Sequence, residues 1–235
     1  NAKEIRSVIS SLNPEDRVKY DYDLLEEKYV ENQNYEVDDE STLETLTNLL
    51  KDKEVLLVAP GKSSVDDLDK VKSYIKEHHP VVRGVNAILK QYSYDYVFLM
   101  SKVRYDYAKE SYKDIFNSTK KILLSNVKTK SLENEYIIRY ERAIKRGWWS
   151  HFDNPVICML RLLNKLHVKN VAIAGFDAFS DKYNESYADP KLPTVHGVED
   201  WDKFNEELRE IALDLINRTK STMSIASVTS KSVII

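Results

Sequence analysis

The stretch E-V-L-L-V-A-P-G-K-S-S-V-D-D-L-D, residues 54–69, decides the fold class. Val55–Ala59 is an unbroken apolar run, which is typical of a strand buried on both faces of a parallel sheet. Pro60-Gly61 ends this strand, and the following S-S-V-D-D offers serines to cap a helix and acids for its first turn. A strand, a glycine turn and a helix N-terminus bind phosphate in α/β folds, because free N–H groups and the helix dipole face the anion.

Outward from this stretch, apolar strands alternate with amphipathic helices. We predict strands at residues 55–59, 80–85, 94–100, 120–125, 170–175 and 222–228, with a short one at 136–139. We predict helices at residues 65–77, 154–167 and 200–217. Strands and helices that alternate across short loops indicate a three-layer α/β/α Rossmann-like domain with a mostly parallel sheet.

The segment before this domain reads differently, since residues 3–50 contain no convincing strand. Ser41-Thr42-Leu43-Glu44 has a capping-box pattern and predicts a helix over residues 43–50 that leads directly into the first strand. We therefore divide the chain into a helical extension, residues 1–50, that links it to an upstream domain, and a Rossmann-like domain, residues 51–235.

The composition is that of a globular protein and gives no sign of a nucleic-acid-binding or membrane-spanning one. The 235 residues are 42% hydrophobic and 31% charged, and suffice for one large domain with or without an appendage. The net charge of −3 gives no reason to expect a nucleic-acid partner, and no apolar run reaches the length of a membrane span. The single cysteine, Cys158, excludes an internal disulfide and predicts a buried thiol in a cytoplasmic protein.

Ligands of open parallel sheets bind beyond the carboxyl ends of the strands. The polar and turn residues expected there are Gly61, Lys62, Ser63, Ser64, Asn86, Ser101, Lys102, Arg104 and Asp177. A helix N-terminus beside three basic side chains suits an anion such as a nucleotide phosphate. The alternative is that Gly61 merely permits the turn and the serines merely cap a helix, as in many domains that bind nothing.

The familiar catalytic and cofactor motifs are absent from the sequence. Gly61-Lys62-Ser63 matches the tail of a P-loop, but the earlier glycine is missing, and there is no G-x-G-x-x-G. No set of His, Cys and acidic residues has the spacing of metal ligands. His151 and His196 are the two candidates for a general base, and an exposed or structurally bonded histidine is the alternative reading of each.

Much of the segment 54–189 resembles the nucleotide-sugar-binding domain of bacterial sialyltransferases. The similar stretches are V-L-L-V-A-P-G-K-S-S at 55–64, D-Y-V-F-L at 95–99 and the helix–strand pair at 154–177, which ends in G-F-D. The resemblance implies a nucleotide site formed by the turn 59–63, Asn86, Asn154, Gly175, Asp177 and a tyrosine, either Tyr183 or Tyr187. In that family the turn contains an Asn that contacts the nucleotide, and this sequence has Pro60 at the corresponding position.

A second resemblance covers residues 5–64. The pattern I-x-x-L-x-P-E-x-R-x-x-Y at 9–20, and the leader helix into L-L-V-A-P-G-K-S, are similar to the segment that follows the barrel in 4-hydroxy-2-oxovalerate aldolase-like proteins. This resemblance implies that the chain is the C-terminal domain of a lyase. The divalent metal of that lyase would lie only in the upstream barrel, so we expect no cofactor here and no carbon–carbon cleavage by this fragment.

Our leading hypothesis is an accessory domain of an aldolase that binds a nucleotide, a nucleotide-sugar or another phosphorylated ligand at the strand carboxyl ends, without catalysis of its own. The expected partner is that small ligand, with neither nucleic acid nor a membrane, and a homo-oligomer is compatible with the sequence. Two alternatives stay open: a sialyltransferase-like glycosyltransferase that uses His151 or His196 as its base, and a purely structural or dimerisation domain.

Overall fold

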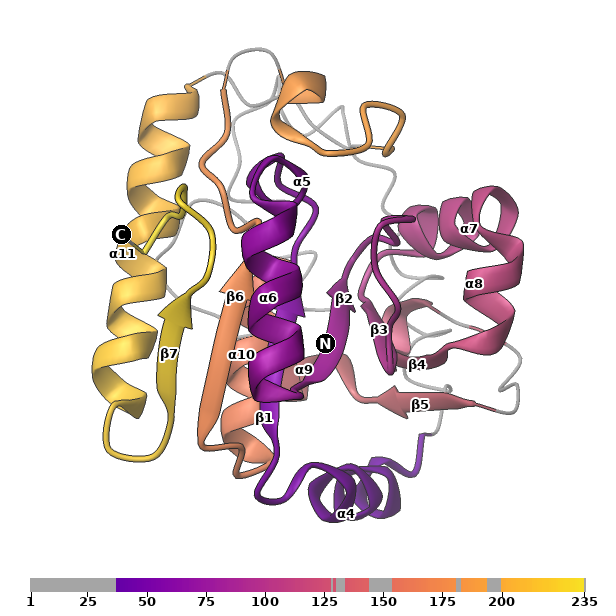
Figure 1. Ribbon diagram of the computed structural model, residues 1–235. Coiled ribbons are helices and arrows are strands. Elements are labelled where there is room, and N and C mark those ends of the chain that lie inside the picture. Colours follow the sequence, from indigo (N-terminus) through magenta and orange to yellow (C-terminus); the bar gives the residue numbers. More distant parts are fainter. Residues whose placement is uncertain are drawn as a thin grey trace, which may run out of the picture. The chain divides into compact units, whose positions relative to one another are not determined.

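The apolar run at residues 55–59 forms an interior strand of a sheet (Figure 1). The computed structural model describes residues 37–127, 129, 134–143, 154–180, 183–193 and 200–234. The strands within these ranges are β1 Glu54–Val58, β2 Val81–Val85, β3 Tyr96–Leu99, β4 Lys120–Leu124, β5 Glu135–Ile138, β6 Asn170–Ala174 and β7 Ser224–Ser227. The predicted strands are confirmed, with ends that differ by a few residues.

The α-helices within the same ranges are α4 Asp39–Leu50, α5 Ser63–Asp66, α6 Leu68–His78, α7 Lys102–Ser111, α8 Lys113–Ser118, α9 Tyr140–Ala143, α10 Pro155–Lys165 and α11 Trp201–Thr219. Two short 3₁₀ turns are η1 Ser125–Val127 and η2 Tyr183–Ser186. None of the helices in the described part of the chain is long and apolar enough to cross a membrane.

The strand order β5-β4-β3-β2-β1-β6-β7 explains where a ligand site belongs. Every pair of neighbouring strands is parallel, so the Rossmann-like prediction is confirmed and the sheet described is parallel throughout. The chain builds β1 to β5 toward one edge and then returns to place β6 on the other side of β1. This reversal is a topological switch point, where the carboxyl ends of β1 and β6 leave a crevice.

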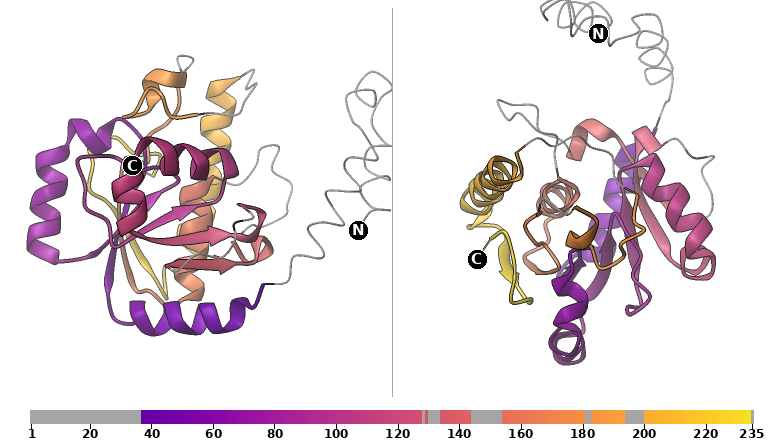
Figure 2. Two further views of the ribbon diagram at one scale, coloured as in Figure 1. Left: turned by 90° about the vertical axis from the view of Figure 1, so that its right-hand side faces the viewer. Right: turned by 90° about the horizontal axis from the view of Figure 1, so that it is seen from above.

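Helices cover both faces of the sheet, which gives the three predicted layers (Figures 1 and 2). Leu56 and Val58 of β1 pack with Val71 of α6 on one face. The alternate side chains, Val55 and Leu57, pack with the apolar stripe of α10 on the other face. The strand register places the cluster under α7 and α8 on the same face as α6. Because β1 is buried on both faces, its sequence reads as a continuous apolar run.

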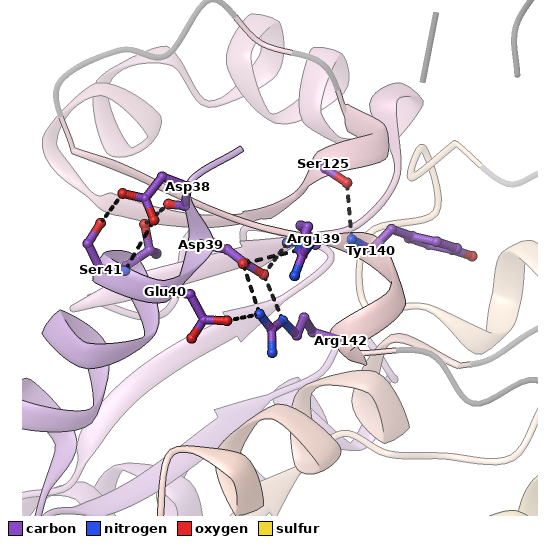
Figure 3. Close-up of polar contacts among 9 residues, drawn as sticks. Asp38, Asp39, Glu40, Ser41, Ser125, Arg139, Tyr140 and Arg142 are labelled. Carbon is purple, nitrogen blue, oxygen red and sulfur yellow. Dashed lines mark hydrogen bonds and ion pairs between the residues drawn. The ribbon is translucent and has the colours of Figure 1, made fainter. Parts of the chain in front are cut away.

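Helix α4 is fixed to the sheet by a cluster of ions at its N-terminus (Figure 3). Asp38 is the N-cap and accepts a hydrogen bond from the Ser41 backbone N–H, so the helix begins before the capping box expected at residues 41–44. Asp39 is 2% exposed and forms ion pairs with the guanidinium groups of Arg139 and Arg142, at 3.2 and 3.0 Å, and it also accepts a hydrogen bond from the Arg139 backbone N–H. Burial raises the pKa of Asp39, but the bonds from Arg142 and Arg139 outweigh it and leave a lowered pKa.

The apolar side of α4 belongs to the same core as the sheet. Leu46 and Leu50 are fully buried in the cluster that contains β1 and α10. The compact unit built on the sheet extends over residues 38–235. The structure therefore places α4 with the Rossmann-like domain, whereas the sequence division at residue 50 had put this helix in the extension.

Candidate functional site

The turn after β1 has the expected strand, glycine and helix, but its backbone donors are already used. The N–H of Gly61 donates to the carbonyl of Gly175 at 3.0 Å, and that of Lys62 donates to the carbonyl of Ser186 at 3.2 Å. The N–H of Ser64 donates back to the carbonyl of Gly61 at 3.1 Å. A phosphate site of this type needs free N–H groups, and these three have partners within the chain.

The remaining donor of the turn is taken by a carboxylate of the protein. Asp177 follows β6, and its Oδ2 accepts a hydrogen bond from the Ser63 N–H at 2.7 Å while its Oδ1 accepts one from the Ser63 Oγ at 2.5 Å. Charge-assisted bonds of this kind are among the stronger ones in proteins. Asp177 thus occupies the N-terminus of α5, where the sequence predicted a phosphate.

Gly61 is required by this arrangement. A Cβ atom at position 61 would lie 2.3 Å from the carbonyl oxygen of Gly175 and 2.7 Å from the Cγ of Asp177. Both distances are far inside van der Waals contact. The glycine therefore permits the close approach of the end of β6 and of the Asp177 carboxylate. The sequence analysis had expected a bound phosphate in the place that this carboxylate occupies.

The predicted serine caps are wrong in detail. The N-cap of α5 is Lys62, whose side chain makes no capping bond. The Ser63 hydroxyl is directed to Asp177, and the Ser64 hydroxyl donates to the Gly61 carbonyl at 2.7 Å. The helix expected over residues 65–77 is also divided, since α5 ends at Asp66 and α6 begins at Leu68, with Asp67 between them.

A hollow of about 450 Å³, including the solvent at its mouth, lies at the switch point where β1, β2 and β6 end. The predicted site residues that line it are Ala59, Pro60, Gly61, Asn86, Arg104, Asn154, Gly175, Asp177 and Tyr187. Five other predicted residues are not in the lining: Lys62, Ser63, Ser64, Ser101 and Lys102. The structure thus brings together residues from six separate segments and leaves these serines out of the lining.

The N-terminus of α10 borders this pocket through Asn154, Pro155 and Val156. Asn154 is the N-cap, and its side chain accepts a hydrogen bond from the Val156 N–H at 2.8 Å. Pro155 occupies the first helical position, where its missing N–H costs nothing. The positive end of the helix dipole therefore lies at the pocket wall and favours a negative ligand group there.

Asn86 contributes a polar side chain from the end of β2. Its backbone is in the left-handed region at φ 54°, and its N–H donates to the carbonyl of Phe98 at 2.7 Å. Its side-chain oxygen accepts a bond from the Met100 N–H at 3.3 Å. With the oxygen engaged by the protein, the amide NH₂ is the group of Asn86 that remains for a ligand.

Arg104 is the cation of the pocket. This residue of α7 is 8% exposed, it lines the hollow, and its Nη1 atom has no hydrogen-bond partner among the residues described. Its guanidinium carbon lies 5.1 Å from the centre of the Tyr187 ring. Lys102, the neighbouring basic residue of the sequence prediction, is instead half-exposed, pairs with Asp106 and does not line the hollow.

Tyr187 belongs to the segment 186–189, called the strap, which pairs with the turn after β1. The N–H of Ala188 donates to the Pro60 carbonyl at 2.8 Å, which completes the bridge between Gly61 and Tyr187. Beyond it, Asp189 accepts hydrogen bonds from two tyrosine hydroxyls, that of Tyr107 in α7 at 2.8 Å and that of Tyr112, the C-cap of α7, at 2.6 Å. The strap thereby joins α7, which carries Arg104, to the turn after β1.

A second buried arginine shows that burial alone does not define the site. Arg83 in β2 is fully buried, and its three side-chain nitrogens have no hydrogen-bond partner within the described ranges. Its guanidinium carbon lies 4.8 Å from the centre of the Tyr96 ring. Burial lowers the pKa of Arg83 to about 10, which still leaves it charged at neutral pH. Unlike Arg104, it does not line the pocket.

Two predicted catalytic candidates are not placed. His151 and His196 lie outside the described residues, so the suggestion that either acts as a base stays a prediction. Among the residues that the structure does describe, no group of three or more His, Cys, Asp and Glu side chains is arranged to hold a metal ion.

Comparisons of the chain with protein-family models, with curated proteins and with solved structures gave no match. The sialyltransferase-like and aldolase-like resemblances of the sequence therefore stay predictions.

Proposed function

We propose that the domain binds a small phosphorylated ligand, such as a nucleotide or a nucleotide-sugar, in the pocket at the carboxyl ends of β1 and β6. The observation that carries this proposal is Arg104, a cation more than nine-tenths buried, whose Nη1 points to no protein acceptor among the described residues. A buried charged donor without a partner is costly, and a ligand anion would relieve that cost.

Three features support an anion at this place. Arg104 is the one positively charged residue among the described residues of the lining, and its planar guanidinium suits two phosphate oxygens. The N-terminus of α10 adds the favourable end of an 11-residue helix dipole. Asn86 adds a neutral NH₂ donor, so a charged group and a hydroxyl or carbonyl of the same ligand could both be bound.

The rest of the lining suits the uncharged part of such a ligand. Val85, Phe176, Phe179 and Tyr187 give the wall an apolar and aromatic character. Sites for nucleotides and other small molecules combine such walls with a few polar groups that fix orientation. The aromatic rings offer flat surfaces to a base or to a sugar face.

We propose binding without catalysis, in an accessory domain of an aldolase-like protein. Asp177 is the one carboxylate of the described lining, and both of its oxygens already accept hydrogen bonds from Ser63. A general base needs an oxygen within reach of the proton that it removes. No observation on the described residues favours the glycosyltransferase alternative over binding.

The test is a thermal-shift series with inorganic phosphate, CMP, CMP-sialic acid and UDP-sugars on the whole chain. A ligand that binds only the folded state at about a hundred times its Kd stabilises by about 2.7 kcal/mol. For a domain of this size we expect a rise in Tm of about 5–10 °C. If none of these compounds raises the Tm, the proposal is wrong.

Arg104→Met identifies the pocket as the site of that effect. Methionine retains an apolar stem and loses the cation, so we expect affinity for the active compound to fall by about 10–100-fold. The ligand-free variant should be at least as stable as the wild type, because an unpartnered buried donor has been removed. Lys102→Met removes an exposed cation of the same helix and should leave affinity unchanged; an Arg104→Met protein that binds as tightly as wild type contradicts the proposal.

A further inference from the structure

The pocket holds one fixed negative charge as well as one positive charge. Asp177 and Arg104 are the charged residues of its described lining. The carboxylate of Asp177 is held by the Ser63 N–H at 2.7 Å and by the Ser63 hydroxyl at 2.5 Å. A ligand that enters beside Arg104 therefore meets a carboxylate at the β1 side of the same hollow.

This carboxylate has little freedom to move aside. Its Cγ would lie 2.7 Å from a Cβ at position 61, which shows how closely it packs on the Gly61 backbone. The Ser63 hydroxyl that binds it also lies 3.4 Å from the Lys231 carbonyl of the C-terminal segment. Because both Asp177 oxygens have donors, rotation away from the pocket would break two charge-assisted bonds.

The position of the carboxylate is that of an anion in an α/β phosphate site. It lies at the start of α5 and accepts a backbone N–H of the turn after β1, as a phosphate oxygen would. A ligand with a chain of two phosphates could reach both the α10 side and the β1 side of a switch-point crevice. Here the second place is occupied by the protein itself.

We propose that Asp177 is a specificity-determining residue that limits the pocket to ligands with a single anionic group. The inference rests on the proposed function, since it assumes that an anion binds beside Arg104. A second phosphate directed toward β1 would be repelled by a like charge within a few ångströms, and it would find the Ser63 N–H already engaged. A ligand with one phosphate or one carboxylate avoids this repulsion.

The experiment compares the Kd values of inorganic phosphate and pyrophosphate by calorimetry on the whole chain. The wild type should bind pyrophosphate no more tightly than phosphate, although pyrophosphate carries more charge. Asp177→Asn keeps the shape and an acceptor for Ser63, and it removes the charge. In this variant we expect the affinity for pyrophosphate to rise relative to phosphate by about tenfold or more.

Asp67→Asn is the matched control. Asp67 also accepts bonds from a serine, the Ser230 N–H at 2.5 Å and the Ser230 hydroxyl at 2.6 Å, but it does not line the pocket. Its substitution removes the same charge from a similar motif, and it should leave the ratio of the two Kd values unchanged. If Asp177→Asn does not fold, Asp177→Ser removes the charge with a smaller side chain and carries the same expectation.

The outcomes separate the two proposals. A wild type that binds phosphate through Arg104, with the same anion ratio in the Asp177 variants, overturns the specificity role and leaves the proposed function intact. A wild type that prefers pyrophosphate by tenfold overturns the specificity role directly. If neither the wild type nor the variants bind either anion, both proposals are wrong.

Discussion

The turn that leads into α5 and the N-terminus of α10 both border the switch-point pocket, but the protein treats the two helix starts differently. At α5 the donors of the turn are bonded to the chain, and the Asp177 carboxylate occupies the place of an anion. At α10 the neutral Asn154 caps the first turn, and Arg104 of α7, which lines the same pocket, has no partner for its Nη1 among the described residues. The first terminus is thus satisfied internally, whereas the second shares the pocket with a cation that lacks a partner for one nitrogen.

The difference teaches that a phosphate-like backbone shape and an available anion site are separate properties. The strand, glycine and helix after β1 have the required shape, but shape offers no binding energy once its N–H groups are paired. The sequence before α10 has no signature of a phosphate loop. The capacity of the pocket for an anion comes from Arg104, a buried donor of α7 that has no acceptor for its Nη1 among the described residues.

The largest effect that we predict follows from the tight packing at α5. Gly61→Ala should destabilise the domain by about 3 kcal/mol, because the new Cβ would meet the Gly175 carbonyl oxygen at 2.3 Å and backbone cannot easily yield. Pro155→Ala at the first position of α10 should cost less than about 1 kcal/mol. Urea unfolding of the two variants measures both values, and similar losses would remove the contrast between the two termini.

The next effect concerns the bond that holds Asp177. Ser63→Ala removes the hydroxyl donor and should cost about 2 kcal/mol of unfolding free energy, since a largely buried carboxylate loses one of two donors. Ser101→Ala, at a predicted site residue whose side chain makes no capping bond, should change stability by less than about 0.5 kcal/mol. Equal stabilities for the two variants in chemical denaturation would show that the Ser63–Asp177 pair does not hold the α5 terminus closed.

The third prediction concerns anion binding at the N-terminus of α10, and it is tested by adding a carboxylate there like the one that Asp177 provides at α5. Asn154→Asp keeps a capping oxygen for Val156, so stability should change by less than about 0.5 kcal/mol. The added negative charge in the pocket wall should weaken binding of inorganic phosphate by about tenfold in calorimetry. Asn164→Asp adds the same charge near the other end of α10, where its oxygen accepts a bond from Thr222, and it should leave affinity unchanged. Equal affinity in both variants would mean that the anion does not bind at the α10 terminus.

Much of the fold could be predicted because buried parallel strands have a simple sequence signature. Val55–Ala59 and the run at 170–175 are apolar on every residue that faces a helix layer, and both are strands in the structure. The end of a strand then locates the site, which is why Asn86, Gly175 and Asp177 were found. The helix cap at Asp38 was missed, since the serine pattern one turn later gave a similar signal.

The chemical state of the site could not be predicted from local patterns. Asp177 reaches Ser63 across 114 residues of sequence, so only the folded sheet reveals that it fills the turn. Lys102 and Arg104 looked equivalent in the sequence, and the difference arises from which side of α7 packs against Tyr187 and the strap. Distinguishing a paired donor from an unpaired one requires the tertiary contacts.

The smallest effect that we predict concerns pH: the contributions of Asp177 and Asp67 to the free energy of unfolding should change in opposite directions as the pH rises. Burial raises the pKa of Asp177 above its usual 3.8, although the bonds from Ser63 act in the opposite direction. The folded state therefore holds this proton more tightly than the unfolded state, and the contribution of Asp177 to stability falls as pH rises through the interval above 3.8. The bonds from Ser230 lower the pKa of the more exposed Asp67, so its contribution is present above 3.8 and is lost as pH falls below it.

The measurement is the unfolding free energy of the wild type minus that of Asp177→Asn, and likewise for Asp67→Asn, in urea between about pH 3 and 6. Each difference cancels the titration of the other carboxylates, which are common to both proteins. The Asp177 difference should decrease with pH and the Asp67 difference should increase, because two similar serine–aspartate motifs differ in burial. If both differences changed with pH in the same direction, the Asp177 carboxylate would be solvated like that of Asp67. A solvated carboxylate at α5 would leave room for the second phosphate that we expect the pocket to reject.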